Sequence, residues 1–126
     1  MIKILTLFGL LIVVSFLTGC ERTFYYKKNI TGRFYLVEDE SASGKSLCIK
    51  HGKDSWQHLI TGDIVYVLAN KTKILIQQKR TAPSWSYYYL IDVSTTEYEE
   101  DILKITETEF YIIKDTLRAD FNFKIE

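Results

Sequence analysis

The stretch DIVYVLANKTKILIQQKRTAPSWSYYYLID, residues 63–92, decides the fold, because apolar side chains recur at every second position along most of it. A period of two places successive side chains on opposite faces of a β-strand. Three strands are therefore predicted, over residues 63–69, 73–79 and 85–92. Asn70-Lys71 suits a tight turn between the first two, and Pro83 lies where it can interrupt the chain without spoiling a strand.

Weaker patterns of the same period lie on both sides of this stretch. They predict further strands over residues 32–38, 46–50, 56–60 and 121–125. Between the second and third of these, the segment His51-Gly52-Lys53-Asp54 contains a glycine that suits a turn. Strands that follow one another so closely along the chain indicate an antiparallel meander.

A helix is predicted near the C-terminal end of the chain. Thr106 and Glu109 have the Thr-x-x-Glu spacing of a capping box, in which two side chains satisfy free backbone N–H groups at a helix start. Phe110, Ile113 and Leu117 then recur at three and four residues, which forms an apolar stripe that would press on a sheet. The predicted fold class is α+β, an antiparallel β-meander of about six or seven strands with one C-terminal helix packed on the sheet.

The composition fits one ordinary globular domain. The chain has 126 residues, of which 47% are apolar, with 16 Lys+Arg against 16 Asp+Glu. This length is enough for one domain and too short for two, and the apolar content lies outside the range of disordered chains. The zero net charge argues against a nucleic-acid partner, which usually requires a basic excess. A single globular α+β domain is predicted over residues 32–126.

The first twenty residues have the pattern of a secretory signal. Lys3 precedes a mostly apolar run over residues 4–16, which is shorter than the roughly 20 residues that a membrane-spanning helix needs. The alternative is an uncleaved N-terminal transmembrane anchor. The run is followed by Leu17-Thr18-Gly19-Cys20, which resembles the lipobox of bacterial lipoproteins in residue order, spacing and distance from the N-terminus.

That resemblance implies a signal peptide over residues 1–19, cleavage before Cys20, and acyl chains on its thiol and on the new amino terminus. Several acyl chains hold a protein stably on a membrane, whereas one holds it only reversibly. The expected partner is therefore the membrane, through lipidated Cys20, and the expected location is the cell envelope, where neither nucleotides nor nucleic acids are expected partners. Glu21 differs from the Asp of the inner-membrane retention signal in enteric bacteria. The outer membrane, facing the periplasm, is favoured, although a Gram-positive surface anchor would use the same sequence.

Residues 20–31 are expected to form the lipidated N-terminus and a short tether. They mix basic and aromatic side chains, a composition that suits a chain lying near lipid headgroups. In the alternative interpretation, Phe24, Tyr25 and Tyr26 begin the first strand and belong to the core.

The order of segments also resembles a family of small, uncharacterised bacterial lipoproteins of unknown function. The resemblance rests on residues 30–32, 34–36, 60–67, 74–79, 88–92 and 109–110. It supports the predicted fold and the envelope location. The family brings no catalytic residues that would imply an activity.

Few residues suggest catalysis. Cys48 alternates with Leu47 and Ile49 and is interpreted as a small, half-buried apolar residue rather than as a reactive thiol. Neither His51 nor His58 has a second ligand at the spacing of a zinc site. Consecutive acids in a polar loop are usually solvated, and such acids occur at Glu97, Glu99, Glu100 and Asp101. We expect no catalytic, cofactor-binding or metal-binding residues and no cofactor, although convergence of Asp92, His58 and Cys48 in one cleft would indicate an enzyme.

Two features point to binding. Trp85, Tyr87 and Tyr89 share one face of a predicted strand and form a candidate binding face, with packing in the core as the alternative. Charge is also divided along the chain. Residues 21–81 carry eleven Lys+Arg against six Asp+Glu, and residues 82–126 carry four against ten.

These observations favour a non-catalytic binding module that takes an envelope protein or a cell-wall component as its partner. The alternative is an inhibitor or immunity-type lipoprotein that blocks a periplasmic hydrolase by inserting a loop, for which residues 38–44 and 97–101 are the candidates. A binder of cell-wall fragments would instead show a concave aromatic pocket near Trp85 and Tyr87.

Overall fold

The computed structural model describes residues 24–125, so the predicted signal peptide and Cys20 lie outside the described residues. The elements follow one another as β1 (Tyr26–Thr31), β2 (Phe34–Glu38), β3 (Lys45–Gly52), β4 (Ser55–Ala69), β5 (Lys73–Thr81), β6 (Ser84–Asp92), the 3₁₀ helix η1 (Glu99–Asp101), β7 (Leu103–Ile105), α2 (Glu107–Thr116) and β8 (Phe121–Lys124). β1 to β7 are neighbours in sequence order, and β8 pairs with β4. All pairs are antiparallel. The predicted α+β meander with a C-terminal helix is confirmed.

β4 is longer than the sequence suggests and bends the sheet. The two predicted strands over residues 56–60 and 63–69 are one 15-residue strand. Gly62 and Asp63 both have positive φ, 79° and 56°, and they form a bulge between its two halves. The first half pairs with β3, whereas the second half pairs with β5 on one edge and β8 on the other. The prediction of two separate strands is wrong, because the chain bends at Gly62 and Asp63 without leaving the strand.

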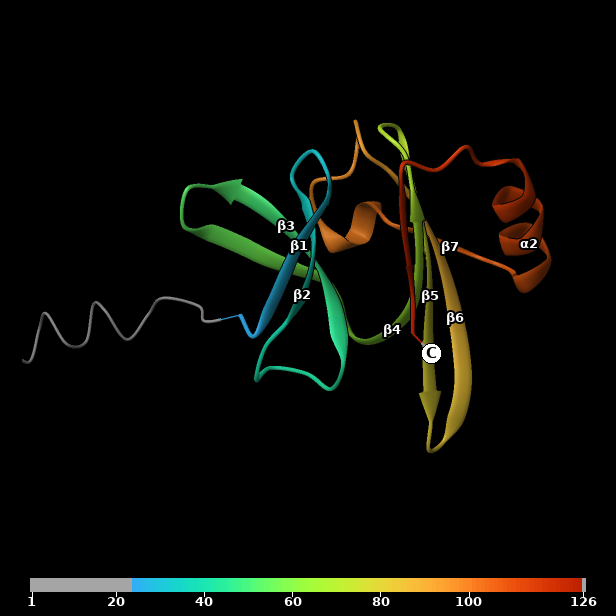
Figure 1. The fold of residues 1–126 in the computed structure, drawn as a ribbon, viewed down its shortest axis with the longest axis horizontal. Coiled ribbons are helices and arrows are strands. Elements are labelled where there is room, and N and C mark those ends of the chain that lie inside the picture. The colour runs from blue at the N-terminus through green and yellow to red at the C-terminus, as the bar shows by residue number, and fades with distance from the viewer. Residues whose placement is uncertain (1–23, 126) are drawn as a thin grey trace, which may run out of the picture.

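The bend folds the sheet into two layers that enclose the main core (Figure 1). β1 to β3 form one layer with the first half of β4, and β5 to β7 continue from its second half. Buried side chains from β1 to β6 fill the space between the layers. The largest fully buried ones in this cluster are Phe34, Leu36, Leu47, Ile49, Ile64, Ile74, Ile76, Ile91 and Val67. Each such side chain contributes about 1.5–3 kcal/mol through removal from water.

The helix α2 covers the other face of β5 and β6 and forms a second, smaller core. Thr106 is its N-cap, and Glu109 completes the predicted capping box. Phe110, 1% exposed, packs against Tyr66 and Tyr88, with ring centroids 5.8 Å and 4.7 Å away. Leu75 of β5 lies in the same cluster. The predicted apolar stripe on the helix is therefore the surface that binds the sheet.

The folded domain begins before residue 32. Residues 26–31 of the predicted tether form β1, which pairs with β2, and Ile30 is buried in the main core. The alternative that assigned this segment to the first strand is correct from Tyr26 onward. β7 is an additional strand that the sequence does not reveal, because its three residues are too few to show a period.

Candidate functional site

Trp85, Tyr87 and Tyr89 lie on the same face of β6, as their alternation predicts. This face is the inner one, because Tyr89 packs against the main core. Their partners across the β5–β6 pair are Arg80, Gln78 and Ile76. We call Trp85, Tyr87 and Tyr89 the aromatic strip.

The bend in β4 leaves one end of the aromatic strip open to solvent. Pairing between β4 and β5 ends at Ile64 and Gln78, whereas β5 and β6 remain paired as far as Thr81 and Ser84. The β5–β6 hairpin therefore extends past the point where β4 turns away, and its end projects from the molecule in Figure 1. Tyr87 is 39% exposed there. The strip thus runs from the exposed hairpin into the molecule, so core packing accounts for only its inner end.

The rings of the strip lie close together and carry cations on their faces. The centroids of Trp85 and Tyr87 are 4.6 Å apart, and those of Tyr87 and Tyr89 are 6.5 Å apart. The Arg80 guanidinium lies 5.3 Å from the Trp85 ring, and Lys104 Nζ lies 3.5 Å from the Tyr87 ring. Such cation–π contacts hold the rings in defined orientations. Preorganised aromatic faces are suited to stacking on flat or ring-shaped groups of a partner.

The inner end of the strip borders a pocket of about 310 Å³. Its lining comes from β4, β5, β6 and the segment around η1, and consists of Leu59, Ile60, Thr61, Gln78, Tyr89, Glu99 and Ile102. The Tyr89 hydroxyl donates to Gln78 Oε1 at 3.1 Å, and Gln78 Nε2 donates to the carbonyls of Thr61 and Gly62. Burial, with smaller effects from Tyr87 and Glu99, raises the pKa of Tyr89, so the phenol keeps its proton at neutral pH. The pocket combines apolar side chains with polar groups that are fixed by hydrogen bonds, so it could hold a ligand that has both apolar and hydrogen-bonding parts.

The acidic segment over residues 97–101, which precedes Ile102 of the pocket, is bound to the first layer through Arg33. The two terminal nitrogens of the Arg33 guanidinium donate to the Glu97 carboxylate, Nη1 at 3.1 Å. The Asp101 carboxylate accepts from the backbone N–H groups of Glu97 and Tyr98, each at 3.0 Å. The bond from Arg33 lowers the pKa of Glu97. These contacts fix η1, which supplies Glu99 to the pocket.

The loop between β2 and β3 brings Ser41, His58 and Asp39 together. Ser41 Oγ lies 3.2 Å from His58 Nε2, and Asp39 Oδ2 lies 3.1 Å from the same nitrogen. The Ser41 hydroxyl donates to Asp39. In a Ser-His-Asp triad the acid and the nucleophile use opposite nitrogens of the imidazole ring. The arrangement therefore ties the loop to β4 rather than activating the serine.

No single cleft brings together Asp92, His58 and Cys48, the three residues whose convergence would indicate an enzyme. Cys48 lies opposite His58 in the β3–β4 pair and is fully buried, where the sequence predicts half burial. Asp92 ends β6, where its carboxylate accepts from Lys73 Nζ at 2.9 Å and from Ser94. His51 lies at the end of β3 and contacts Gln57 and Glu97.

Among residues 24–125, no three His, Cys, Asp or Glu side chains come together in a way that would hold a metal ion. Within those residues no helix has the length and apolarity to cross a membrane.

Several residues of the site escape sequence reasoning. Lys104, Glu99 and Ile102 reach the strip or the pocket from a short strand and a 3₁₀ turn, which carry no periodic signal. Gln78 is the exception. It follows Ile74 and Ile76 at every second position of β5, so its side chain is expected on the same buried face. A polar side chain at such a position is a sign that the apolar core ends there. No family model, curated protein or solved structure matches this chain.

Proposed function

We propose that the chain is a lipid-anchored protein of the cell envelope that acts by binding rather than by catalysis. Its binding face is the aromatic strip with the adjoining pocket, and its partner is another envelope protein or a cell-wall component. The observation that carries this proposal is the strip itself, in which three rings on one face of β6 lead from an exposed hairpin to a pocket of about 310 Å³ that Tyr89 lines. Neighbouring rings beside a partly polar pocket favour a ligand that presents a ring or a flat apolar surface.

The anchor is proposed on the sequence alone, from the lipobox Leu17-Thr18-Gly19-Cys20. The strands, the helix and both cores lie within residues 24–125, C-terminal to Cys20. Acylation at Cys20 would therefore leave the folded domain intact and place it on the outer side of a membrane. We propose the periplasmic face of the outer membrane as its location.

Site-specific photo-crosslinking in intact cells tests the binding face. The full chain carries p-benzoylphenylalanine in place of Tyr87, which is 39% exposed on the strip. The matched control carries the same probe in place of Tyr111, which is 47% exposed on α2. We expect a discrete crosslinked product from position 87 and none of the same mass from position 111.

A second substitution makes that result specific to the strip. Trp85→Ala removes the ring that packs against position 87, so the crosslinked product should be lost while the amount of folded protein stays similar. An identical product from both probe positions, or a product that survives Trp85→Ala, would contradict the proposed face.

Detergent partition tests the anchor separately. We expect the wild-type chain to enter the detergent phase and Cys20→Ala to remain in the aqueous phase after its leader has been removed, because the acyl chains are lost. Continued partition of the variant into detergent, together with an unmodified Cys20 in the mass spectrum of the wild type, would refute lipid attachment.

A further inference from the structure

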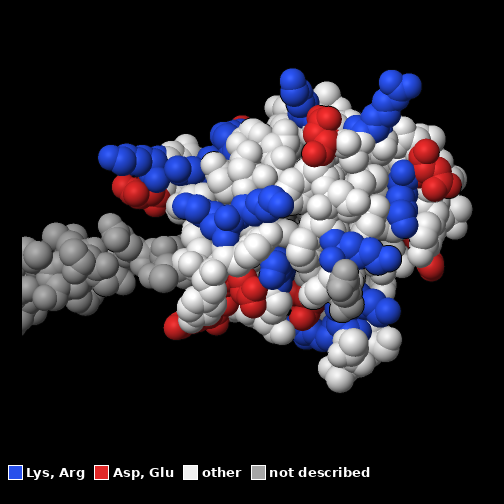
Figure 2. All heavy atoms as spheres, in the orientation of Figure 1, with Lys and Arg blue, Asp and Glu red and all other residues white. Residues whose placement is uncertain are grey.

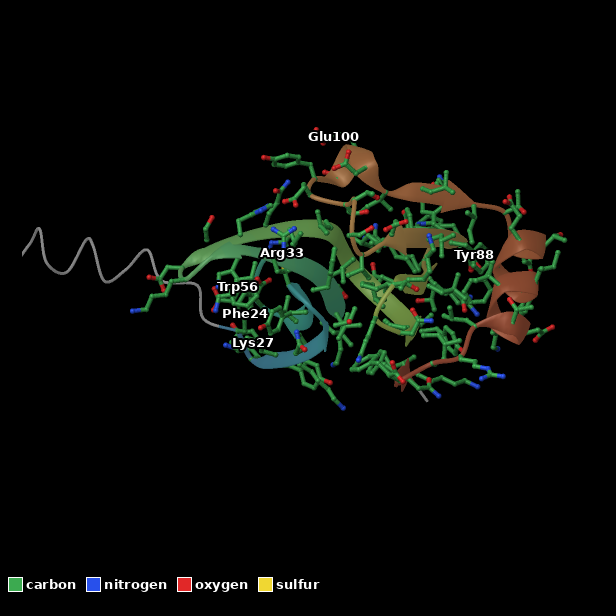
Figure 3. All side chains as sticks on the ribbon, turned by 90° about the horizontal axis from the view of Figure 1, so that it is seen from above. Phe24, Lys27, Arg33, Trp56, Tyr88 and Glu100 are labelled. Atoms are coloured by element: carbon green, nitrogen blue, oxygen red, sulfur yellow. The ribbon has the colours of Figure 1, made fainter. Side chains whose placement is uncertain are left out.

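A second aromatic group lies at the opposite end of the molecule from α2. Phe24 and Tyr35 both contact the Trp56 ring edge-on, with centroids 5.2 Å and 4.9 Å from it. The three rings lie on the outer face of the first layer, since Tyr35 pairs with Cys48 and Trp56 with Lys50, opposite the core positions. Each ring is partly exposed. Figure 3 shows Phe24, Lys27 and Trp56 side by side at this end, with Tyr88 at the other end next to α2.

Two lysines flank these rings. Lys27 Nζ lies 5.6 Å and Lys50 Nζ lies 5.3 Å from the centroid of the Trp56 ring. Among the ion pairs of residues 24–125, none involves either lysine. We call Phe24, Tyr35, Trp56, Lys27 and Lys50 the basic aromatic face. Its ammonium groups are held in place by rings and keep their charge available to an external anion.

Three acids at the end of β2 and in the loop after it are engaged with other groups, and Asp54 lies in the β3–β4 turn two residues before Trp56. Glu38 binds Lys45 at 3.0 Å, Glu40 accepts from the Tyr25 hydroxyl at 2.7 Å, and Asp39 contacts His58. Figure 2 shows Lys and Arg side chains across the visible face, including its β1–β3 end, with acidic side chains among them. The basic aromatic face therefore presents a local excess of positive charge beside exposed aromatic edges.

The position of the face in the chain restricts what it can meet. Phe24 is the first described residue and follows Cys20 by four residues. Four fully extended residues span at most about 14 Å. An acyl group on Cys20 would thus hold Phe24, and with it the Trp56 ring, close to the headgroup layer. Trp and Tyr rings favour that layer, and lysines there are attracted by anionic lipids.

We propose that the basic aromatic face rests on anionic lipid headgroups and fixes the orientation of the domain on the membrane. The proposal rests on the proposed lipid anchor at Cys20, which brings the face within reach. Contact at this face directs the remainder of the domain, including α2, away from the membrane, because the two lie at opposite ends of the molecule (Figure 3). The lipid anchor then supplies attachment, and the face supplies orientation.

Tryptophan quenching in the full chain tests this contact. The chain has two tryptophans, so Trp85→Phe leaves Trp56 as the reporter, and Trp56→Phe is the matched control with Trp85 as the reporter. Each is reconstituted with vesicles of phosphatidylcholine, with or without phosphatidylglycerol, that carry a spin-labelled headgroup quencher. We expect quenching and a blue shift of Trp56 with phosphatidylglycerol, reduced quenching of Trp56 with phosphatidylcholine alone, and no quenching of Trp85.

Charge reversal distinguishes binding of anionic lipid by the basic aromatic face from a general attraction that depends only on net charge. In the Trp56 reporter, Lys27→Glu with Lys50→Glu should abolish the part of the quenching that depends on phosphatidylglycerol. Lys71→Glu with Lys79→Glu changes the net charge equally at exposed positions on other elements and should preserve it. High salt should weaken the effect, because the Debye length falls from about 10 Å at 0.1 M to about 3 Å at 1 M.

Flotation with the same vesicles distinguishes the two proposals. A chain that floats with both lipid compositions but shows no quenching of Trp56 overturns the orienting face and leaves the anchor intact. A chain that floats only with phosphatidylglycerol, with Trp56 quenched, supports the face and overturns the anchor. Equal quenching of Trp56 and Trp85, or equal loss with both charge-reversal pairs, also overturns the face.

Discussion

Gly62 sets the direction of β4. Its φ of 79° lies in the left-handed region, and a Cβ atom built there would come within 2.8 Å of the Ser43 carbonyl oxygen. Its N–H donates to Ser46 Oγ at 2.8 Å, and its carbonyl accepts from Gln78 at 2.8 Å. The bulge is therefore fixed by hydrogen bonds on both sides, and only glycine fits the space without strain.

Gly62→Ala should lower the free energy of unfolding by at least about 2 kcal/mol, because it adds left-handed strain to a backbone clash. Gly52→Ala is the control, since the nearest side-chain atom to its added Cβ is 4.0 Å away. That change should leave stability within about 0.5 kcal/mol. Urea unfolding monitored by circular dichroism measures both values. Equal effects of the two substitutions would refute the assigned role of Gly62.

Asp92 links stability to acid pH. Hydrogen bonds from Lys73 and Ser94 lower the pKa of Asp92 to about 2. The unfolded chain takes up the proton at higher pH than the folded chain, so this contribution is present above about pH 4 and is lost as the pH falls toward 2. In Asp92→Asn, the free energy of unfolding should therefore fall less steeply over this range. Lys73→Ala should give an intermediate slope, and an unchanged slope in Asp92→Asn would contradict the linkage.

At the scale of elements, α2 depends on the capping box at its N-terminus. Thr106 Oγ1 accepts from the Glu109 N–H at 3.1 Å, and the Glu109 carboxylate accepts from the Thr106 N–H at 3.2 Å. Thr106→Ala should destabilise the protein by about 0.5–2 kcal/mol. Thr108→Ala, at an exposed position in the first turn of the helix, should have no such cost. Thermal unfolding of the two variants compares them, and equal midpoints would contradict the capping role.

The elements also show where sequence reasoning succeeds and where it fails. The capping box, the apolar stripe and the strands β5 and β6 follow from local patterns that survive in the fold, since each element is long enough to show its period. The bend in β4 does not follow, because glycine with a neighbouring aspartate is compatible with both a turn and a bulge. Only long-range pairing of its two halves with β3 and β5 decides between them.

At the scale of the whole molecule, the candidate site is a product of that bend. The sequence places Trp85, Tyr87 and Tyr89 on one face, which the β5–β6 register confirms. The sequence does not predict that the hairpin end of this face is exposed to solvent, because that exposure depends on where β4 separates from β5. The pocket likewise needs Glu99 and Ile102 to lie beside β4, and the nearby Arg33–Glu97 contact joins residues 64 positions apart. This contact also pairs the basic first part of the chain with its acidic second part.

The boundary of the domain can be tested by truncation. A chain that begins at residue 21 retains β1, whereas one that begins at residue 32 loses it. Loss of β1 removes Ile30, 7% exposed in the main core, and leaves the edge of β2 unpaired. Removal of one buried Ile side chain alone costs about 2–5 kcal/mol, which is a large part of the roughly 5–15 kcal/mol stability of a typical domain.

The longer chain should therefore unfold cooperatively in urea, and the shorter chain should unfold at a much lower urea concentration or fail to fold. Ile30→Ala in the longer chain separates the loss of the side chain from the loss of strand pairing, and its unfolding midpoint should lie between the two. Equal midpoints for the chains that begin at residues 21 and 32 would show that β1 contributes little, and that residues 20–31 act as the tether that their composition suggests.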